Sequence, residues 1–134
     1  MKVAIIGAGN MGGSIACGLA KGKLISASDI IVSNPSAGKL EALKKEFPSI
    51  TTTRNNAEAA IGADIVILTV KPWLIRSVLR EMKLKSKQIL VSVAAGISFE
   101  QLAHDVVEPE MPMFRIVPNT AISELQSMTL IASR

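Results

Sequence analysis

The sequence predicts an α/β protein of the Rossmann type, in which a doubly wound, mostly parallel sheet carries helices on both faces. Two observations predict this fold. A short apolar strand at residues 3–6 runs directly into Gly7-Ala8-Gly9-Asn10-Met11-Gly12 and then into an Ala-rich helix at about residues 11–21. Beyond it, strand-sized apolar segments alternate with helical segments, which implies right-handed crossovers between parallel strands.

The three glycines of the Gly-x-Gly-x-x-Gly pattern each have a separate task. We expect Gly7 to permit the tight turn, Gly9 to let the backbone approach a pyrophosphate, and Gly12 to let the helix lie close to the sheet. The helix that begins near Asn10 and Met11 would offer free N–H groups and a partial positive charge to phosphates. Between a strand and a helix, the pattern predicts a dinucleotide site.

The other elements follow from apolar runs and turn residues. We expect strands at 29–33, 50–53, 64–70, 88–93, 113–117 and 128–132. We expect helices after the turn Asn34-Pro35-Ser36, at 56–61, after Pro72, and after a capping box at Ser98 and Gln101. Residues 1–134 contain no visible linker or repeat and are expected to form one dinucleotide-binding domain.

Composition argues against several classes of protein. Hydrophobic residues make up 49% and charged residues 19% of the chain, as is typical of a globular α/β protein, and no apolar run is long enough for a membrane span. Cys17 is the only cysteine, which excludes a disulfide framework, and we expect a buried thiol there. The mild net charge of +4 favours no nucleic-acid partner, and no metal-ligand cluster is apparent. Without a leader before the first strand, we expect a cytoplasmic protein.

The end of the second strand favours NADP(H) as the cofactor, with NAD(H) as the alternative. An acidic residue there would bind the ribose 2′-hydroxyl of NAD, but Ser33 and Asn34 occupy the position and Asp29 lies at the wrong end. Hydroxyl and amide groups can donate to a 2′-phosphate, which a carboxylate would repel. We therefore predict a 2′-phosphate pocket at Asn34 and Ser36, with Lys39 as a candidate cation. The alternative is that Asn34 or Ser36 only caps the helix and Lys39 is solvated.

Four further segments make the prediction more specific. They are Asn55-Asn56-Ala57-Glu58-Ala59-Ala60, Thr69-Val70-Lys71-Pro72, Val93-Ala94-Ala95-Gly96-Ile97 and Arg115-Ile116-Val117-Pro118-Asn119-Thr120. With the glycine pattern, their order and spacing resemble the N-terminal domain of the pyrroline-5-carboxylate reductase family over essentially the whole chain. Val-Lys-Pro, Ala-Gly-Ile and Pro-Asn-Thr together are much more specific than the glycines alone.

The resemblance implies a Rossmann domain followed by an all-helical domain that makes a homodimer or higher oligomer. It implies hydride transfer from NAD(P)H to the C=N carbon of 1-pyrroline-5-carboxylate, which gives L-proline. It also implies site residues: 7–12 for the pyrophosphate, Ser33, Asn34 and Ser36 for the adenosine phosphate, Asn56 near the adenosine, Val70, Lys71 and Pro72 in the cofactor cleft, and Ala95, Gly96, Pro118, Asn119 and Thr120 by the nicotinamide. All these segments fall beyond the carboxyl ends of the predicted strands, where ligands bind in such sheets. Each could alternatively be only a strand end or a turn.

The sequence departs from the family pattern at three places. Residues 121–127 contain no glycine, whereas the family usually continues Pro-Asn-Thr with proline and a glycine-rich run. Trp73 after Lys71-Pro72 is unusual, and we expect it to pack or lie at the surface. The helical domain, with its substrate loop, has no counterpart, so we expect the chain to be a fragment of a longer protein.

No catalytic residue is predicted from the chain. The cofactor carries the hydride, but imine reduction also needs a protonated nitrogen. His104 falls in mid-helix and is interpreted as a surface or core histidine, and Lys71 as a cleft residue. Three hypotheses remain: the cofactor domain of a pyrroline-5-carboxylate reductase, that of a related 3-hydroxyacid dehydrogenase or deazaflavin-dependent NADP oxidoreductase, and a non-enzymatic NADP-binding module.

Overall fold

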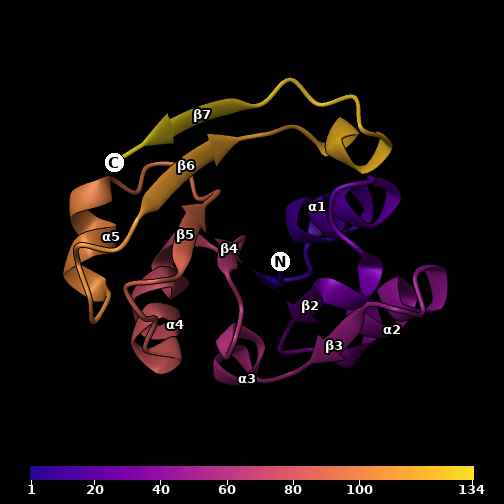
Figure 1. Ribbon diagram of the computed structural model, residues 1–134, viewed down its shortest axis with the longest axis horizontal. Coiled ribbons are helices and arrows are strands. Elements are labelled where there is room, and N and C mark those ends of the chain that lie inside the picture. The colour runs from indigo at the N-terminus through magenta and orange to yellow at the C-terminus, as the bar shows by residue number, and fades with distance from the viewer.

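A seven-stranded sheet in the order β3-β2-β1-β4-β5-β6-β7 forms the centre of the computed structural model, which describes residues 1–119 and 121–134 (Figure 1). The first six strands are parallel, and β7 runs antiparallel to β6. The predicted Rossmann-type fold is therefore confirmed. The strands are β1 (Val3–Ile6), β2 (Ile30–Ser33), β3 (Thr51–Thr53), β4 (Ile65–Leu68), β5 (Ile89–Ser92), β6 (Met113–Val117) and β7 (Leu130–Ser133).

Helices cover both faces of the sheet, as Figure 1 shows. On one face, Val3 and Ile5 of β1 pack with Ile15 and Leu40 from the first two helices. On the other, Ala4 and Ile6 belong to the cluster that holds α3, α4 and α5 against the sheet. All four residues of β1 are buried, which explains an apolar run without polar alternation. The helices are α1 (Asn10–Lys21), α2 (Ala37–Glu46), α3 (Asn56–Ala60), α4 (Ile75–Met82) and α5 (Phe99–Asp105).

Several strands and helices begin or end at residues other than those predicted. Asp29 lies in a short 3-10 helix, η1 (Ala27–Asp29), so β2 starts one residue later than expected. The strand predicted at 64–70 ends at Leu68 because the Thr69 hydroxyl turns back and donates to the carbonyls of Ile6 and Gly7. After Pro72 the chain forms η2 (Pro72–Leu74) before α4. The capping box at Ser98 and Gln101 is present as predicted.

The segment after β6 returns across α1. It forms η3 (Thr120–Glu124), and a Cβ atom on Gly18 of α1 would collide with the Ile122 carbonyl oxygen. An ion pair of 2.8 Å between Lys21 Nζ and Glu124 Oε1 adds to this contact. The glycine-free run at 121–127 therefore begins as a short 3-10 helix held against α1, which ends at Glu124, and the chain then continues into the exposed strand β7.

Cys17 is half-buried rather than buried as expected. It lies on α1, with its Sγ 4.0 Å from Oε2 of the exposed Glu46 at the end of α2. Partial burial and the Glu46 carboxylate both raise the pKa of this thiol. The thiol is thus held in its protonated, unreactive form near neutral pH.

No helix in the described part of the chain has both the length and the apolar character that crossing a membrane requires.

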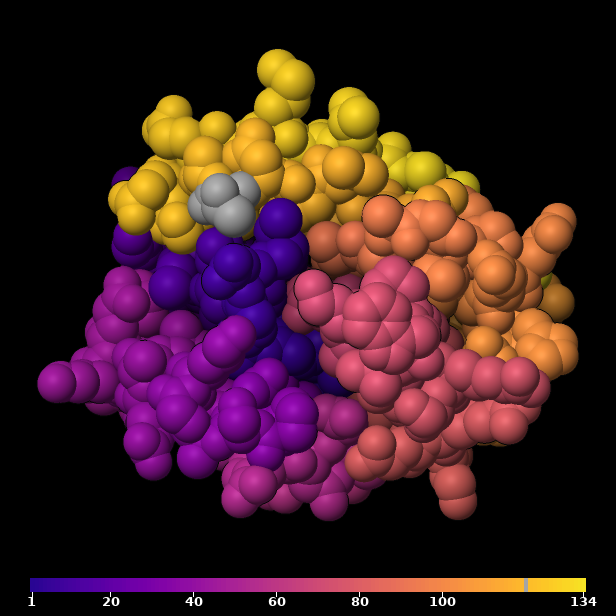
Figure 2. Space-filling model, turned by 180° about the vertical axis from the view of Figure 1, so that it is seen from behind, coloured from indigo at the N-terminus to yellow at the C-terminus, as the bar shows by residue number. Residues whose placement is uncertain are grey.

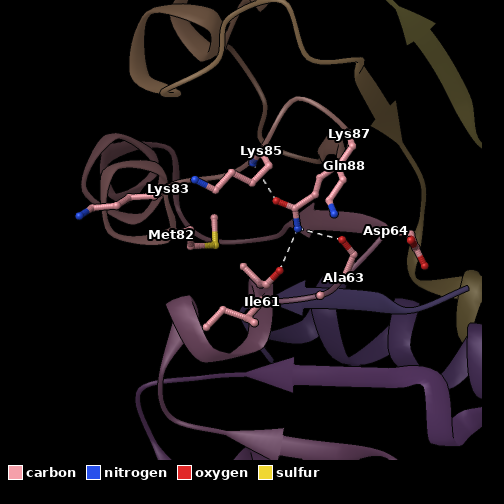
Figure 3. Close-up of a pocket in the computed structure, with 10 residues that line it drawn as sticks. Ile61, Ala63, Asp64, Met82, Lys83, Lys85, Lys87 and Gln88 are labelled. Carbon is pink, nitrogen blue, oxygen red and sulfur yellow. Dashed lines mark hydrogen bonds between the residues drawn. The ribbon is translucent and has the colours of Figure 1, made fainter.

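A pocket of about 340 Å³ lies at the amino ends of β4 and β5, away from the glycine turn (Figure 3). Its buried polar residue is Gln88, whose side chain accepts a hydrogen bond from the Lys85 N–H (2.9 Å). The same amide donates to the carbonyls of Ala60 (2.9 Å) and Ala63 (2.8 Å), and Figure 3 shows Lys83 pointing away from it. Gln88 therefore joins the end of α3 to the start of β5, and we interpret it as structural.

The exchange Gln88→Leu is expected to lower the free energy of unfolding by about 2 to 4 kcal/mol. It would leave the Ala60 and Ala63 carbonyls and the Lys85 N–H without the hydrogen bonds that the amide makes. Urea denaturation followed by circular dichroism measures this loss. The control Gln126→Leu alters an exposed glutamine and is expected to change stability by less than about 0.5 kcal/mol. Equal stabilities of the two variants would contradict the structural role of Gln88.

Candidate dinucleotide-binding site

The turn between β1 and α1 is built on Gly7. Its φ of +107° lies in a region that side-chain-bearing residues rarely adopt. Its N–H donates to the Ser33 carbonyl (2.8 Å), and a Cβ atom there would lie 2.8 Å from Thr69 Oγ1. Gly7 thus permits the tight turn that the sequence predicts, against the ends of β2 and β4.

Gly12 sets the distance between α1 and this turn. A Cβ atom at Gly12 would collide with the Gly7 carbonyl oxygen and would lie 2.5 Å from Thr69 Oγ1. The first turn of α1 therefore rests directly on the backbone that leaves β1. Close helix–sheet packing is the role that the sequence assigns to this glycine.

Unlike Gly7 and Gly12, Gly9 has open space at the position that a Cβ atom would occupy. A Cβ atom there would meet nothing within 4 Å, and no side chain caps the helix N-terminus at this residue. The N–H groups of Asn10, Met11 and Gly12 lie in the first helical turn, where helices provide no acceptor, and no acidic residue lies there. Free N–H groups, the positive end of the helix dipole and open space fit a diphosphate.

A pocket of about 250 Å³ opens beside Gly9 at the carboxyl ends of β1, β2, β3 and β4. Figure 2 shows indigo N-terminal residues recessed between the purple segment that follows β2 and the rose segment that follows β4. The structure thus brings together six of the predicted site residues and adds five others. The predicted ones are Gly7, Gly9, Asn34, Asn56, Val70 and Lys71; the others are Pro35, Arg54, Thr69, Leu74 and Val78.

Asn34 connects the end of β2 to the glycine turn. Its Oδ1 accepts from the Ala8 N–H (3.0 Å), and its Nδ2 donates to Ser36 Oγ (2.9 Å) and to the Ser36 carbonyl (3.2 Å). Ser36 is the N-cap of α2, but no side-chain capping hydrogen bond is formed there. The helix-capping alternative for these two residues is therefore not what the structure contains.

Ser33 and Lys39 occupy contrasting environments. Ser33 is fully buried, and its hydroxyl donates to Asn56 Oδ1 (2.7 Å), so it supports Asn56 from beneath the pocket. Lys39 is exposed on α2 and does not line the pocket. Their assignment to the adenosine phosphate remains a prediction, with Ser33 placed to act through Asn56.

The segments predicted near the nicotinamide lie at the same sheet edge but outside this pocket. Gly96, with a φ of +75°, makes the turn between β5 and α5 next to Ala95. Asn119 Oδ1 accepts from the Ala121 N–H (3.0 Å), which shapes the start of η3, and Thr120 lies outside the described residues. Pro72 and the exposed Trp73 line a neighbouring groove toward α5. Gly96 and Asn119 shape turns in this structure, and the cofactor contacts predicted for these segments and for Pro72 remain predictions.

Candidate proton donors are scarce around the pocket. Lys71 is exposed at its rim, whereas His104 is exposed on α5, 3.1 Å from Asp105 Oδ1. Among the described residues, no group of three or more His, Cys, Asp and Glu side chains could hold a metal ion. Sequence reasoning missed Arg54, although it directly follows a predicted strand and therefore falls at the ligand-binding edge.

Known proteins resemble this chain along most or all of its length. Residues 2–96 match the family model described as NADP oxidoreductase, coenzyme F420-dependent. A pyrroline-5-carboxylate reductase of Pseudomonas aeruginosa is 38% identical over 89% of this chain and 43% of its own length. Pyrroline-5-carboxylate reductase 1 of Dictyostelium discoideum is 35% identical over 98% of this chain and 24% of its own.

A solved structure agrees with these relatives. The pyrroline carboxylate reductase of Plasmodium falciparum, crystallised with NADP bound, superposes with a TM-score of 0.86 at 26% identity, over 100% of this chain and 48% of that protein. The chain thus spans less than half the length of the relatives named here. It belongs to the family described as NADP oxidoreductase, coenzyme F420-dependent, and the predicted resemblance to the N-terminal domain of pyrroline-5-carboxylate reductases is confirmed.

Proposed function

We propose that this chain binds NADP(H) as the dinucleotide-binding domain of a pyrroline-5-carboxylate reductase. The observation that carries the proposal is the open space at Gly9 in front of the unpaired N–H groups of α1. The similarity along the chain to pyrroline-5-carboxylate reductases supports it, as does the related structure with NADP bound.

In this function the residues of the chain bind and orient the dinucleotide. The first turn of α1 holds the diphosphate, and Asn34 fixes the end of β2 relative to that turn. Val70 and Lys71, which follow β4, line the same pocket as Gly9, so the dinucleotide would lie at the ends of β1 and β4. When bound, NADPH supplies the hydride, and the protein contributes orientation and electrostatics.

We propose that a partner segment supplies the remainder of the active site. In the whole protein, a helical domain would bind 1-pyrroline-5-carboxylate, complete a dimer and position the proton for the imine nitrogen, with L-proline as product. This fits a chain that spans less than half of its relatives and places no proton donor other than Lys71 at the described part of the pocket.

A second candidate function is hydride exchange between NADP(H) and a deazaflavin, which the description of the matching family model favours. Both candidates use the same dinucleotide site and differ in the second substrate. A non-enzymatic NADP-binding module would show binding without turnover in any longer form of the protein. Assays of a longer form of this protein with each substrate distinguish the three.

The 134-residue chain is expected to bind NADPH more tightly than NADH, because no carboxylate occupies the end of β2. Titration calorimetry measures both affinities. The quenching of Trp73 fluorescence gives an independent measurement, because Trp73 is the only tryptophan and lies next to the pocket. A clear preference for NADH would contradict the NADP(H) assignment.

The variant Gly9→Val is expected to fold normally and to lose more than about tenfold in NADPH affinity, because its side chain would fill the space assigned to the diphosphate. Calorimetry and thermal denaturation measure the two effects. Gly22→Val is the matched control: Gly22 (φ −71°, ψ 172°) has nearly the backbone of Gly9 (φ −68°, ψ −168°) and lies at the other end of α1. Undiminished binding by Gly9→Val would place the diphosphate elsewhere.

The chain alone is expected to show negligible NADPH-dependent reduction of 1-pyrroline-5-carboxylate, because substrate-binding and proton-donating elements are assigned to the helical domain proposed for the whole protein. Absorbance at the NADPH band and chromatographic detection of proline measure turnover. A full-length relative serves as the positive control. Robust turnover by the 134-residue chain would show that it contains a complete active site.

A further inference from the structure

We propose that Arg54 binds the ribose 2′-phosphate of NADP(H) and sets the preference of this chain for NADP(H) over NAD(H). The inference rests on the proposed function, because it assumes that a dinucleotide lies in the cleft beside Gly9. Arg54 directly follows β3, which pairs in parallel with β2. It therefore lies at the same edge of the sheet as the glycine turn.

The position of Arg54 corresponds to the adenosine side of the cleft. It lines the pocket that contains Gly9 and Asn34, and it also lines the neighbouring groove between α2 and β3. The Arg54 side chain therefore lies between this pocket and this groove, beyond the end of β2. In folds of this type the adenosine ribose is recognised at the end of the second strand, where an arginine accommodates a 2′-phosphate.

Ser33 and Asn34, two of the other candidates for binding the 2′-phosphate, already use their donors in hydrogen bonds inside the protein. The Ser33 hydroxyl is buried and donates to Asn56. Both polar atoms of the Asn34 amide are used, on Ala8 and on Ser36. Of the side chains first assigned to the phosphate, only the Ser36 hydroxyl and the exposed Lys39 ammonium still have hydrogens free to donate. Arg54 adds the one cation that lines the described pocket on the adenosine side.

The guanidinium of Arg54 is held in place and retains free donors. Its Nε donates to the Pro35 carbonyl (2.9 Å), which fixes the side chain against the loop after β2. Within the described residues, no carboxylate lies within 4.0 Å of its nitrogen atoms, and its two Nη groups make no other hydrogen bond. A planar guanidinium with two free N–H groups matches a phosphate bidentately.

Three carboxylates lie near Arg54 and would repel a 2′-phosphate if the arginine were absent. Glu58 accepts from the Thr53 hydroxyl (3.0 Å), Glu81 lies 3.4 Å from Asn56 Nδ2, and Glu41 lines the groove beside α2. Without Arg54, these carboxylates would oppose a 2′-phosphate but would affect a neutral 2′-hydroxyl little. Removal of Arg54 should therefore weaken NADPH binding and leave NADH binding nearly unchanged.

The test compares four chains: the unaltered protein, Arg54→Gln, Arg54→Lys and the matched control Arg80→Gln, which removes an exposed arginine of α4 that does not line the cleft. Calorimetry gives the dissociation constants for NADPH and NADH. Adenosine 2′,5′-bisphosphate and ADP repeat the comparison without the nicotinamide. Circular dichroism and thermal denaturation verify that each variant folds.

Arg54→Gln is expected to weaken NADPH binding by about 10- to 100-fold, the range for a lost hydrogen bond to a charged group, and NADH binding by less than about threefold. Arg54→Lys is expected to fall between, because it keeps the charge but loses the bond to Pro35 and the bidentate fork. Arg80→Gln is expected to leave both affinities unchanged. The bisphosphate should lose affinity in parallel with NADPH, and ADP should not.

Two results would overturn the assignment in different ways. An unchanged ratio of NADPH to NADH affinity in Arg54→Gln, with or without a loss common to both, would overturn the role of Arg54 alone. If the unaltered chain bound neither dinucleotide, the proposed function would fail, and the Arg54 assignment would fail with it.

Discussion

The contact between the first turn of α1 and the backbone that leaves β1 is the constraint on which the rest of the site depends. At Gly12 there is no room for even a methyl group, because the Gly7 carbonyl and the Thr69 hydroxyl occupy that space. The Thr69 hydroxyl donates to Ile6 (2.9 Å) and Gly7 (2.8 Å), which fixes the end of β4 to the same turn. The helix N-terminus is therefore held directly over the strand ends, and its unpaired N–H groups point at whatever occupies the space beside Gly9.

The same contact determines what the end of β2 can do. The Gly7 N–H donates to Ser33, and the Ala8 N–H donates to the Asn34 side chain, so both residues help to shape the turn. The Ser33 hydroxyl and the Asn34 amide N–H groups also donate inside the protein. A donor that already has an acceptor has little left to offer a ligand, since breaking one hydrogen bond to make another yields little net free energy. We therefore expect the adenosine to be recognised by side chains that surround the turn rather than build it.

The sequence predicted the central strands well because β1, β2 and β4 are largely buried on both faces, and burial leaves uninterrupted apolar runs such as Ile65-Val66-Ile67-Leu68. The tasks of Gly7 and Gly12 were also predictable, because a tight turn and a closely packed helix follow from the glycine spacing between a strand and a helix. Contacts between distant segments were not. Nothing near Gly18 indicates that Ile122 would lie on it, and nothing near Asn34 indicates that its amide would bind Ala8. Arg54 was overlooked because its importance arises only when β3 lies beside β2 and the loop at Pro35 comes within reach.

The two halves of the cleft differ in how completely this chain builds them. On the adenosine side, the turn, the amide of Asn34 and the tethered guanidinium of Arg54 are all in place and fixed by hydrogen bonds. On the other side, Asn119 uses its side chain to shape η3, and His104 lies away on α5. In the proposed function, choice of dinucleotide and reduction of a substrate therefore depend on different groups. We expect this chain to express a nucleotide preference without turnover, because the groups proposed to bind the adenosine side all lie within it.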